Sequence, residues 1–132
     1  MANSLYALGR AAFANACINW LTDTIKVGLL SSAYTPNLAT HQFYSDVSAN
    51  VIGTPQTLGT KTNVGGLCGA ANPVFTAVAS GAVTYLVYYK DTGVAGTSPL
   101  IGLVDTATGL PVTANGGDIN VTIDATNKIF KL

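Results

Sequence analysis

Glutamate is absent from this sequence, and charged residues of all kinds make up only 9% of its 132 residues. A typical soluble domain contains about a quarter of charged residues, so this chain is unusually poor in charge. Its six Lys and Arg are scattered along the chain and balance six Asp. Nucleic-acid binding depends on clustered basic residues that displace counterions from phosphates. The composition therefore predicts no nucleic-acid partner.

Cysteine and long apolar runs are also scarce. Cys17 and Cys68 stand far apart without a CxxC motif, which predicts two buried free thiols in a reducing cytoplasm, with one disulfide between them as the alternative. No stretch approaches the ~20 apolar residues of a membrane span. The first residues lack the basic and apolar pattern of a secretory signal. We expect neither a membrane partner nor secretion.

Residues suited to catalysis are few. His41 is the single histidine, and Ser45 and Asp46 are its sequence neighbours, whereas catalytic triads are spatial arrangements. Asp118 and Asp124 do not have the spacing of an EF-hand loop. The chain has no GxSxG or phosphate-binding GxxxxGK[ST] motif. The sequence predicts that the protein is not an enzyme and needs no cofactor or metal.

Apolar residues make up 48% of the chain, and its length suits one domain spanning residues 1–132. Alanines and an apolar stripe at helical spacing predict a helix over residues 4–20, capped by Asn3 or Ser4, with Trp20 on its apolar face. Gly9 is costly inside a helix, by up to about 1 kcal/mol, which suggests close packing at that point.

The remainder, residues 24–132, has β character. Residues 82–90 are the strongest strand, and because both of its faces are largely apolar we expect it to be central. Shorter strands are predicted at residues 24–30, 74–78, 100–104, 118–123 and 128–132, with a Gly-rich turn at residues 115–118. Residues 38–47 favour a short helix, and residues 53–69 a long hairpin or arm.

Short strands at this spacing predict a mainly β fold with an N-terminal helix (α+β), arranged as an antiparallel β-sandwich or a jelly-roll-like barrel. A near-neutral surface is poorly protected against association. Interface cores are likewise depleted in charge. We therefore expect a subunit of a larger assembly. The candidate interface residues are Tyr34, His41, Tyr44, Thr60 and Lys61. Tyr85, Tyr88 and Tyr89 are assigned instead to core and cross-strand packing.

Several segments resemble a family of small proteins encoded among the virion genes of tailed bacteriophages. They are residues 21–27 (LTDTIKV), 34–41 (YTPNLATH), 89–93 (YKDTG), 105–113 (DTATGLPVT) and 127–132 (NKIFKL). The resemblance spans nearly the whole chain, and its motifs are structural turns and strands. It implies a component of a phage particle and identifies no binding residue.

Within that class, we expect a capsid decoration (cement) protein on the outer surface of the head, made in the host cytoplasm. Its expected partners are the major capsid protein and further copies of itself, as a dimer or trimer. Two alternatives remain. One is a tail, collar or head-fibre subunit. The other is a carbohydrate-binding module, which would present exposed aromatic side chains on a flat sheet face.

Overall fold

A computed structural model describes residues 4–105, 112–123, 126 and 128–131. The main sheet is antiparallel, with strand order β1-β8-β7-β2-β3 and with β9 pairing to one end of β7. Its strands are β1 (Ser4–Leu5), β2 (Ile25–Ser31), β3 (Val51–Thr57), β7 (Gly81–Lys90), β8 (Leu100–Val104) and β9 (Val112–Ala114). The ten-residue β7 lies in the middle of this sheet, which confirms the expectation for residues 82–90.

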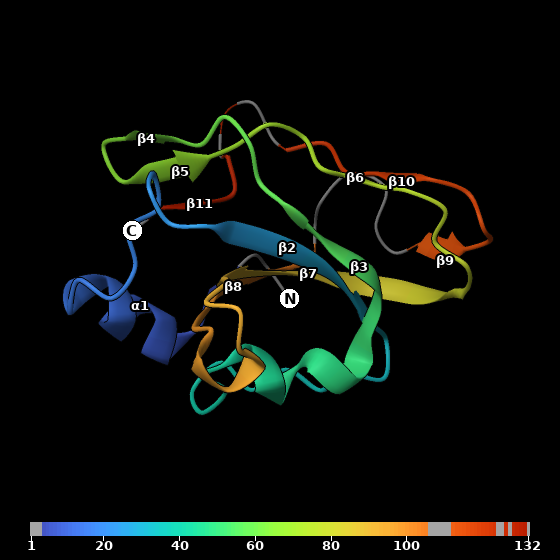
Figure 1. Cartoon of the computed structure of the whole chain (residues 1–132), viewed down its shortest axis with the longest axis horizontal. Coiled ribbons are helices and arrows are strands. Elements are labelled where there is room, and N and C mark those ends of the chain that lie inside the picture. The colour runs from blue at the N-terminus through green and yellow to red at the C-terminus, as the bar shows by residue number, and fades with distance from the viewer. Residues whose placement is uncertain (1–3, 106–111, 124–125, 127, 132) are drawn as a thin grey trace.

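Two small antiparallel sheets cover one face of the main sheet (Figure 1). One has strand order β11-β5-β4 and the other pairs β10 with β6. The strands are β4 (Thr62–Val64), β5 (Leu67–Gly69), β6 (Val74–Phe75), β10 (Ile119–Asn120) and β11 (Phe130–Lys131). The predicted mainly β fold, with antiparallel sheets and an N-terminal helix, is confirmed.

The main sheet is buried on both faces because its central strands carry apolar side chains on each side. The larger cluster lies under the small sheets and includes Val27, Leu86 and Tyr88. The smaller cluster lies on the opposite face and includes Val87 and Tyr89. Successive residues of a strand point to opposite faces, so the one strand β7 supplies both clusters.

One β-bulge changes the side-chain alternation that the sequence indicated. Simple alternation places Val83 on the same face as Val87 and Tyr89. The register between β2 and β7 shifts between Leu30 and Ser31, where Ser31 is paired with Val83. An irregularity of this kind re-aims the side chains beside it. Val83 consequently belongs to the larger cluster, together with Leu86 and Tyr88.

The helix α1 (Ala7–Ala14) is much shorter than the predicted range 4–20. Ser4 belongs to β1, and the N-cap is Tyr6, which makes no side-chain capping bond. The helix ends in a Schellman motif: the N–H of Cys17 donates to the carbonyl of Ala12, and the N–H of Ala16 to that of Phe13. Ala16 adopts a φ of 61°, which reverses the chain and prevents the helix from continuing.

Close packing explains the glycine within this helix, as the sequence suggested. A Cβ atom on Gly9 would lie 2.3 Å from the carbonyl oxygen of Leu100 and 3.1 Å from that of Ile101. No side chain fits at that separation from backbone atoms. The absence of a side chain therefore sets the distance between α1 and the main sheet.

Loops and single turns of 3₁₀-helix cover the face opposite the small sheets (Figure 1). They are η1 (Tyr44–Asp46), η2 (Ser48–Asn50) and η3 (Ala95–Thr97). The short helix expected over residues 38–47 is reduced to η1. The expected arm over residues 53–69 is divided: β3 joins the main sheet, and only β4 and β5 form a hairpin.

The two cysteines are free, but only one is buried. Cys68 lies in the larger cluster, where burial raises the pKa of its thiol to about 11. Cys17 follows the end of α1 and is exposed, which corrects the expectation that both thiols are buried. Along the part of the chain that is described, no helix has the length and apolar character needed to cross a membrane.

Candidate interaction surfaces

A buried chain of hydrogen bonds joins three side chains from the first third of the sequence. The hydroxyls of Tyr6 and Tyr34 are 3.0 Å apart, and the Tyr34 hydroxyl is 2.7 Å from Nδ1 of His41. The ring of Tyr34 also contacts that of Tyr85 edge-on. Burial, together with the bond between the two hydroxyls, raises the pKa of Tyr6. These hydrogen bonds hold residues 34–41 against the main sheet.

Tyr34 is only 4% exposed, so almost none of its side chain is accessible on the isolated chain. Its hydroxyl is occupied by internal partners, because burying a polar group without a partner is costly. His41 is half-buried beside it. Sequence reasoning identified both residues but missed Tyr6, since no periodic pattern links positions so far apart.

Asp46 is engaged by backbone amides. Its Oδ2 accepts hydrogen bonds from the N–H groups of Gln42 at 2.8 Å and Phe43 at 3.0 Å. These bonds, the one from Gln42 first, lower the pKa of Asp46. The carboxylate thus stabilises the turn that leads into η1. His41 bonds to Tyr34 through its Nδ1. In a catalytic triad this nitrogen bonds the orienting aspartate, so here Tyr34, and not Asp46, is in that position.

Tyr44 is half-buried and stacks on Tyr89, with ring centroids 4.3 Å apart and planes inclined by 13°. Burial raises the pKa of both phenols. The candidate residues Tyr34, His41 and Tyr44 therefore lie on one side of the main sheet, around its smaller cluster. Only part of the Tyr44 ring remains available to another molecule.

Thr60 and Lys61 lie elsewhere, in the connection from β3 to β4, on the side of the small sheets (Figure 1). Thr60 is exposed, with a φ of 49°, and lines a hollow of about 390 Å³ together with Asn72 and Lys128. The ammonium of Lys61 donates to the carbonyl oxygen of Asp23. The five candidate residues thus form two separate groups and not one surface.

Two ion pairs occupy one end of β2 and β7. Lys26 is 2.9 Å from Asp91, and Lys90 is 3.2 Å from Asp23. The bond from Lys26, followed by that from the N–H of Gly93, lowers the pKa of Asp91. Burial opposes the same change in Asp23, but its bonds from Asn19 and Lys90 outweigh it and lower the pKa.

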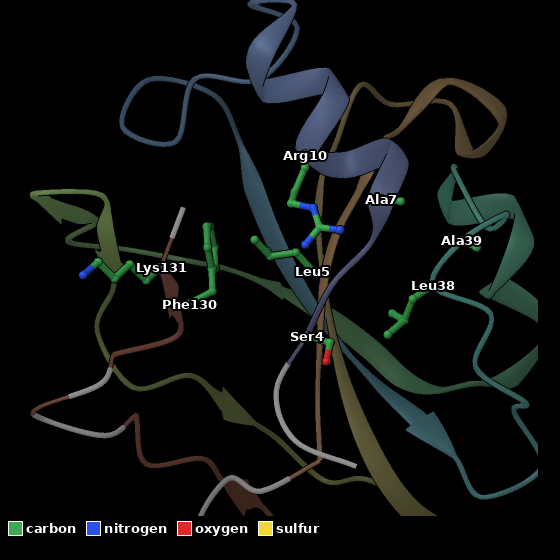
Figure 2. Close-up of a pocket in the computed structure, with 8 residues that line it drawn as sticks. All are labelled: Ser4, Leu5, Ala7, Arg10, Leu38, Ala39, Phe130 and Lys131. Carbon is green, nitrogen blue, oxygen red and sulfur yellow. The ribbon is translucent and has the colours of Figure 1, made fainter.

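A groove of about 560 Å³ crosses the edge of the main sheet at β1 (Figure 2). Its lining residues come from both ends of the chain and from the loop after β2: Ser4, Leu5, Ala7, Arg10, Leu38, Ala39, Phe130 and Lys131. The guanidinium of Arg10 extends from α1 into this space. Sequence reasoning missed the groove, because only the pairing of β11 with β5 places the end of the chain beside α1.

Exposed apolar side chains are distributed over several loops and strands. They are Leu21 at 52%, Val64 at 77%, Val74 at 44% and Val94 at 61% exposure. Trp20 is only 4% exposed, and its indole N–H donates to the carbonyls of Thr62 and Gly69. It therefore lies in the core, outside α1, and is unavailable as an exposed platform for a sugar ring.

Metal-ligating side chains do not gather within the described residues: no three His, Cys or Asp are placed to hold one ion. Oδ1 of Asp118 accepts a hydrogen bond from the N–H of Ala77 at 2.9 Å, and Asp124 lies outside the described residues.

No protein-family model matches the sequence, and no curated protein matches it. The molecule's own surface is therefore the basis for its functional assignment.

Proposed function

We propose that the chain is a virion structural protein of a tailed bacteriophage and serves as a capsid decoration (cement) protein. The surface carries this proposal. Of the six basic residues, Lys26, Lys61 and Lys90 are already engaged by the chain itself. The rest of the exposed surface consists largely of small polar and apolar side chains, including Val64 and Val94. Such a surface suits contact with protein neighbours.

The physical role follows from mass action. A subunit that binds the assembled shell, and not its dissociated parts, stabilises the assembled state by its own binding free energy. The main sheet, covered on one face by the two small sheets, supplies a rigid body, and the loops on its two sides supply the contacts. Bridging of neighbouring capsid subunits requires no bond-making chemistry.

The test compares phage heads with and without this protein. Heads that lack it are expected to release DNA at a lower temperature, and addition of the purified protein should restore the original temperature. Electron cryo-microscopy should show copies distributed over the shell. Unchanged heat resistance together with copies confined to a ring at the portal vertex would contradict decoration and favour a tail or collar subunit.

A carbohydrate-binding role predicts a different result. The isolated protein would then bind host glycans, and replacement of a half-exposed tyrosine such as Tyr44 by alanine would abolish that binding. Glycan-array measurements on the purified protein distinguish the two functions. The buried position of Trp20 gives the carbohydrate hypothesis no specific support.

A further inference from the structure

The groove at β1 exposes the backbone of an edge strand. β1 is the last strand of the main sheet, and Leu5 is paired with Gly102 of β8. The next residue, Tyr6, donates its N–H to the carbonyl of Ile101 at 3.0 Å. Opposed residues in an antiparallel pair alternate between bonded and non-bonded positions. The amide and carbonyl of Leu5 therefore point away from β8. The N–H of Ala7, which points the same way, already donates to the carbonyl of Leu38 at 2.8 Å, so the open part of this edge lies at Leu5.

Apolar side chains flank this edge on both faces of the sheet (Figure 2). Leu5 and Phe130 lie on one side and pack against the larger cluster. Leu38 lies on the other side and packs against the smaller cluster. A strand added beside β1 would direct its successive side chains to these two sides in turn. The groove therefore has the apolar contacts that an added strand needs on each face.

The charge of the groove is positive. Arg10 and Lys131 line it, and neither has a carboxylate at ion-pair distance among the described residues. Three of the six aspartates are engaged elsewhere: Asp23 and Asp91 pair with lysines, and Asp46 binds backbone amides. Charge complementarity therefore favours an acidic occupant.

We propose that the edge of β1 accepts an extended segment of a partner protein as an additional strand. Main-chain hydrogen bonds to Leu5 give the affinity, as in other cases where a peptide extends a sheet. Apolar side chains of the segment contact Leu5 and Leu38, and an acidic side chain pairs with Arg10 or Lys131. The inference deepens the proposed function by taking the shell protein as the source of this segment.

The first experiment measures binding to phage shells that lack the protein. Wild-type protein labelled at the exposed Cys17 is compared with Arg10→Gln, Lys131→Gln and Ala39→Trp. Each charge removal should weaken binding about five- to tenfold, and the bulky tryptophan about tenfold or more. Lys128→Gln and Ala95→Trp are the matched controls, because they alter a cation and an exposed alanine outside the groove, and they should bind like wild type.

A second experiment tests the groove without the shell. A synthetic peptide of alternating valine and aspartate should shift the NMR signals of Leu5 and Arg10 and slow exchange of the Leu5 amide. The peptide with lysine in place of aspartate should not. Wild-type binding to shells with no loss in the three groove variants would overturn the inference and leave the proposed function intact.

Failure of the wild-type protein to bind shells would contradict the proposed function instead. In that case the acidic peptide still tests the groove, and unchanged NMR signals and amide exchange of Leu5 overturn the inference. A dimer that Ala39→Trp dissociates would also overturn it, since the occupant would then be a second copy of this chain.

Discussion

At the scale of single residues, the hydroxyl of Tyr34 connects the interior to the surface. It bonds Tyr6 on one side and His41 on the other. His41 lies in the same loop as Tyr34, whereas Tyr6 is 28 positions away, before α1. The sequence drew attention to Tyr34 and His41 because tyrosine and histidine are common at interfaces. It gave no indication of their internal partner, because a hydrogen bond between residues 28 positions apart leaves no periodic signal.

Removal of this hydroxyl should destabilise the fold. Tyr34→Phe leaves the buried Tyr6 hydroxyl without its partner, and we expect the free energy of unfolding to fall by about 1–3 kcal/mol. The double variant Tyr6→Phe with Tyr34→Phe should lose less than the sum of the two single changes. Urea titration of all three variants measures the effect. Tyr85→Phe is the control, and an equal loss there would contradict this explanation.

At the scale of elements, the bounds of a helix or strand were predicted well where the local sequence pattern determines them, and poorly where other factors do. β8 has the predicted bounds, and β7 differs from its prediction by one residue, because long apolar alternation determines a central strand. The predicted end of the helix at residue 20 was wrong. The helix stops earlier because Ala16 adopts the left-handed conformation that glycine usually supplies. The hairpin of β4 and β5 was overestimated because every residue of β4 is exposed, so its extent depends on the partner strand.

The unusual residue at the end of α1 leads to a prediction. A non-glycine residue in the left-handed region costs roughly 1 kcal/mol, and Ala16 is exposed, so its methyl group contributes little packing. Ala16→Gly should therefore raise the free energy of unfolding by about 0.5–1 kcal/mol. The matched change Ala14→Gly, two residues earlier and still helical, should lower it by about 1 kcal/mol. Thermal and urea unfolding distinguish the two, and destabilisation by both would refute the assignment.

The ion pairs at the end of β2 and β7 predict a dependence on pH. The pKa of Asp91 is lowered in the folded state, so its stabilising contribution is present above the ordinary carboxyl pKa of about 3.9. It is lost as the pH falls through the lowered value. Lys26→Gln removes the pair, so it should be less stable than wild type at pH 7, and this difference should shrink in acid. Urea titrations at several pH values measure it, with Lys128→Gln as control, because Lys128 forms no ion pair with another described residue. A difference that stays constant with pH would contradict the assignment.

At the scale of the whole molecule, the two apolar clusters share the same strands. β2, β7 and β8 each contribute side chains to both clusters, and the sheet between them is continuous. Neither cluster retains its supporting backbone if the other is lost. The protein should consequently unfold in one cooperative step, although its interior has two parts on opposite sides of a sheet.

Native chromophores allow this to be tested, because each cluster contains its own. Trp20 and one tyrosine, Tyr88, belong to the larger cluster, whereas Tyr6, Tyr34 and Tyr89 belong to the smaller one, so tryptophan reports on the larger cluster alone and most of the tyrosine signal comes from the smaller. Tryptophan fluorescence and tyrosine near-ultraviolet circular dichroism should follow the same urea transition. Leu86→Ala and Val87→Ala, adjacent in β7 but facing opposite clusters, should each lower the free energy of unfolding by about 1–4 kcal/mol and move both signals together. Separation of the two curves in either variant would show that the clusters unfold independently, because only a shared central sheet couples a deletion on one face to the signal from the other.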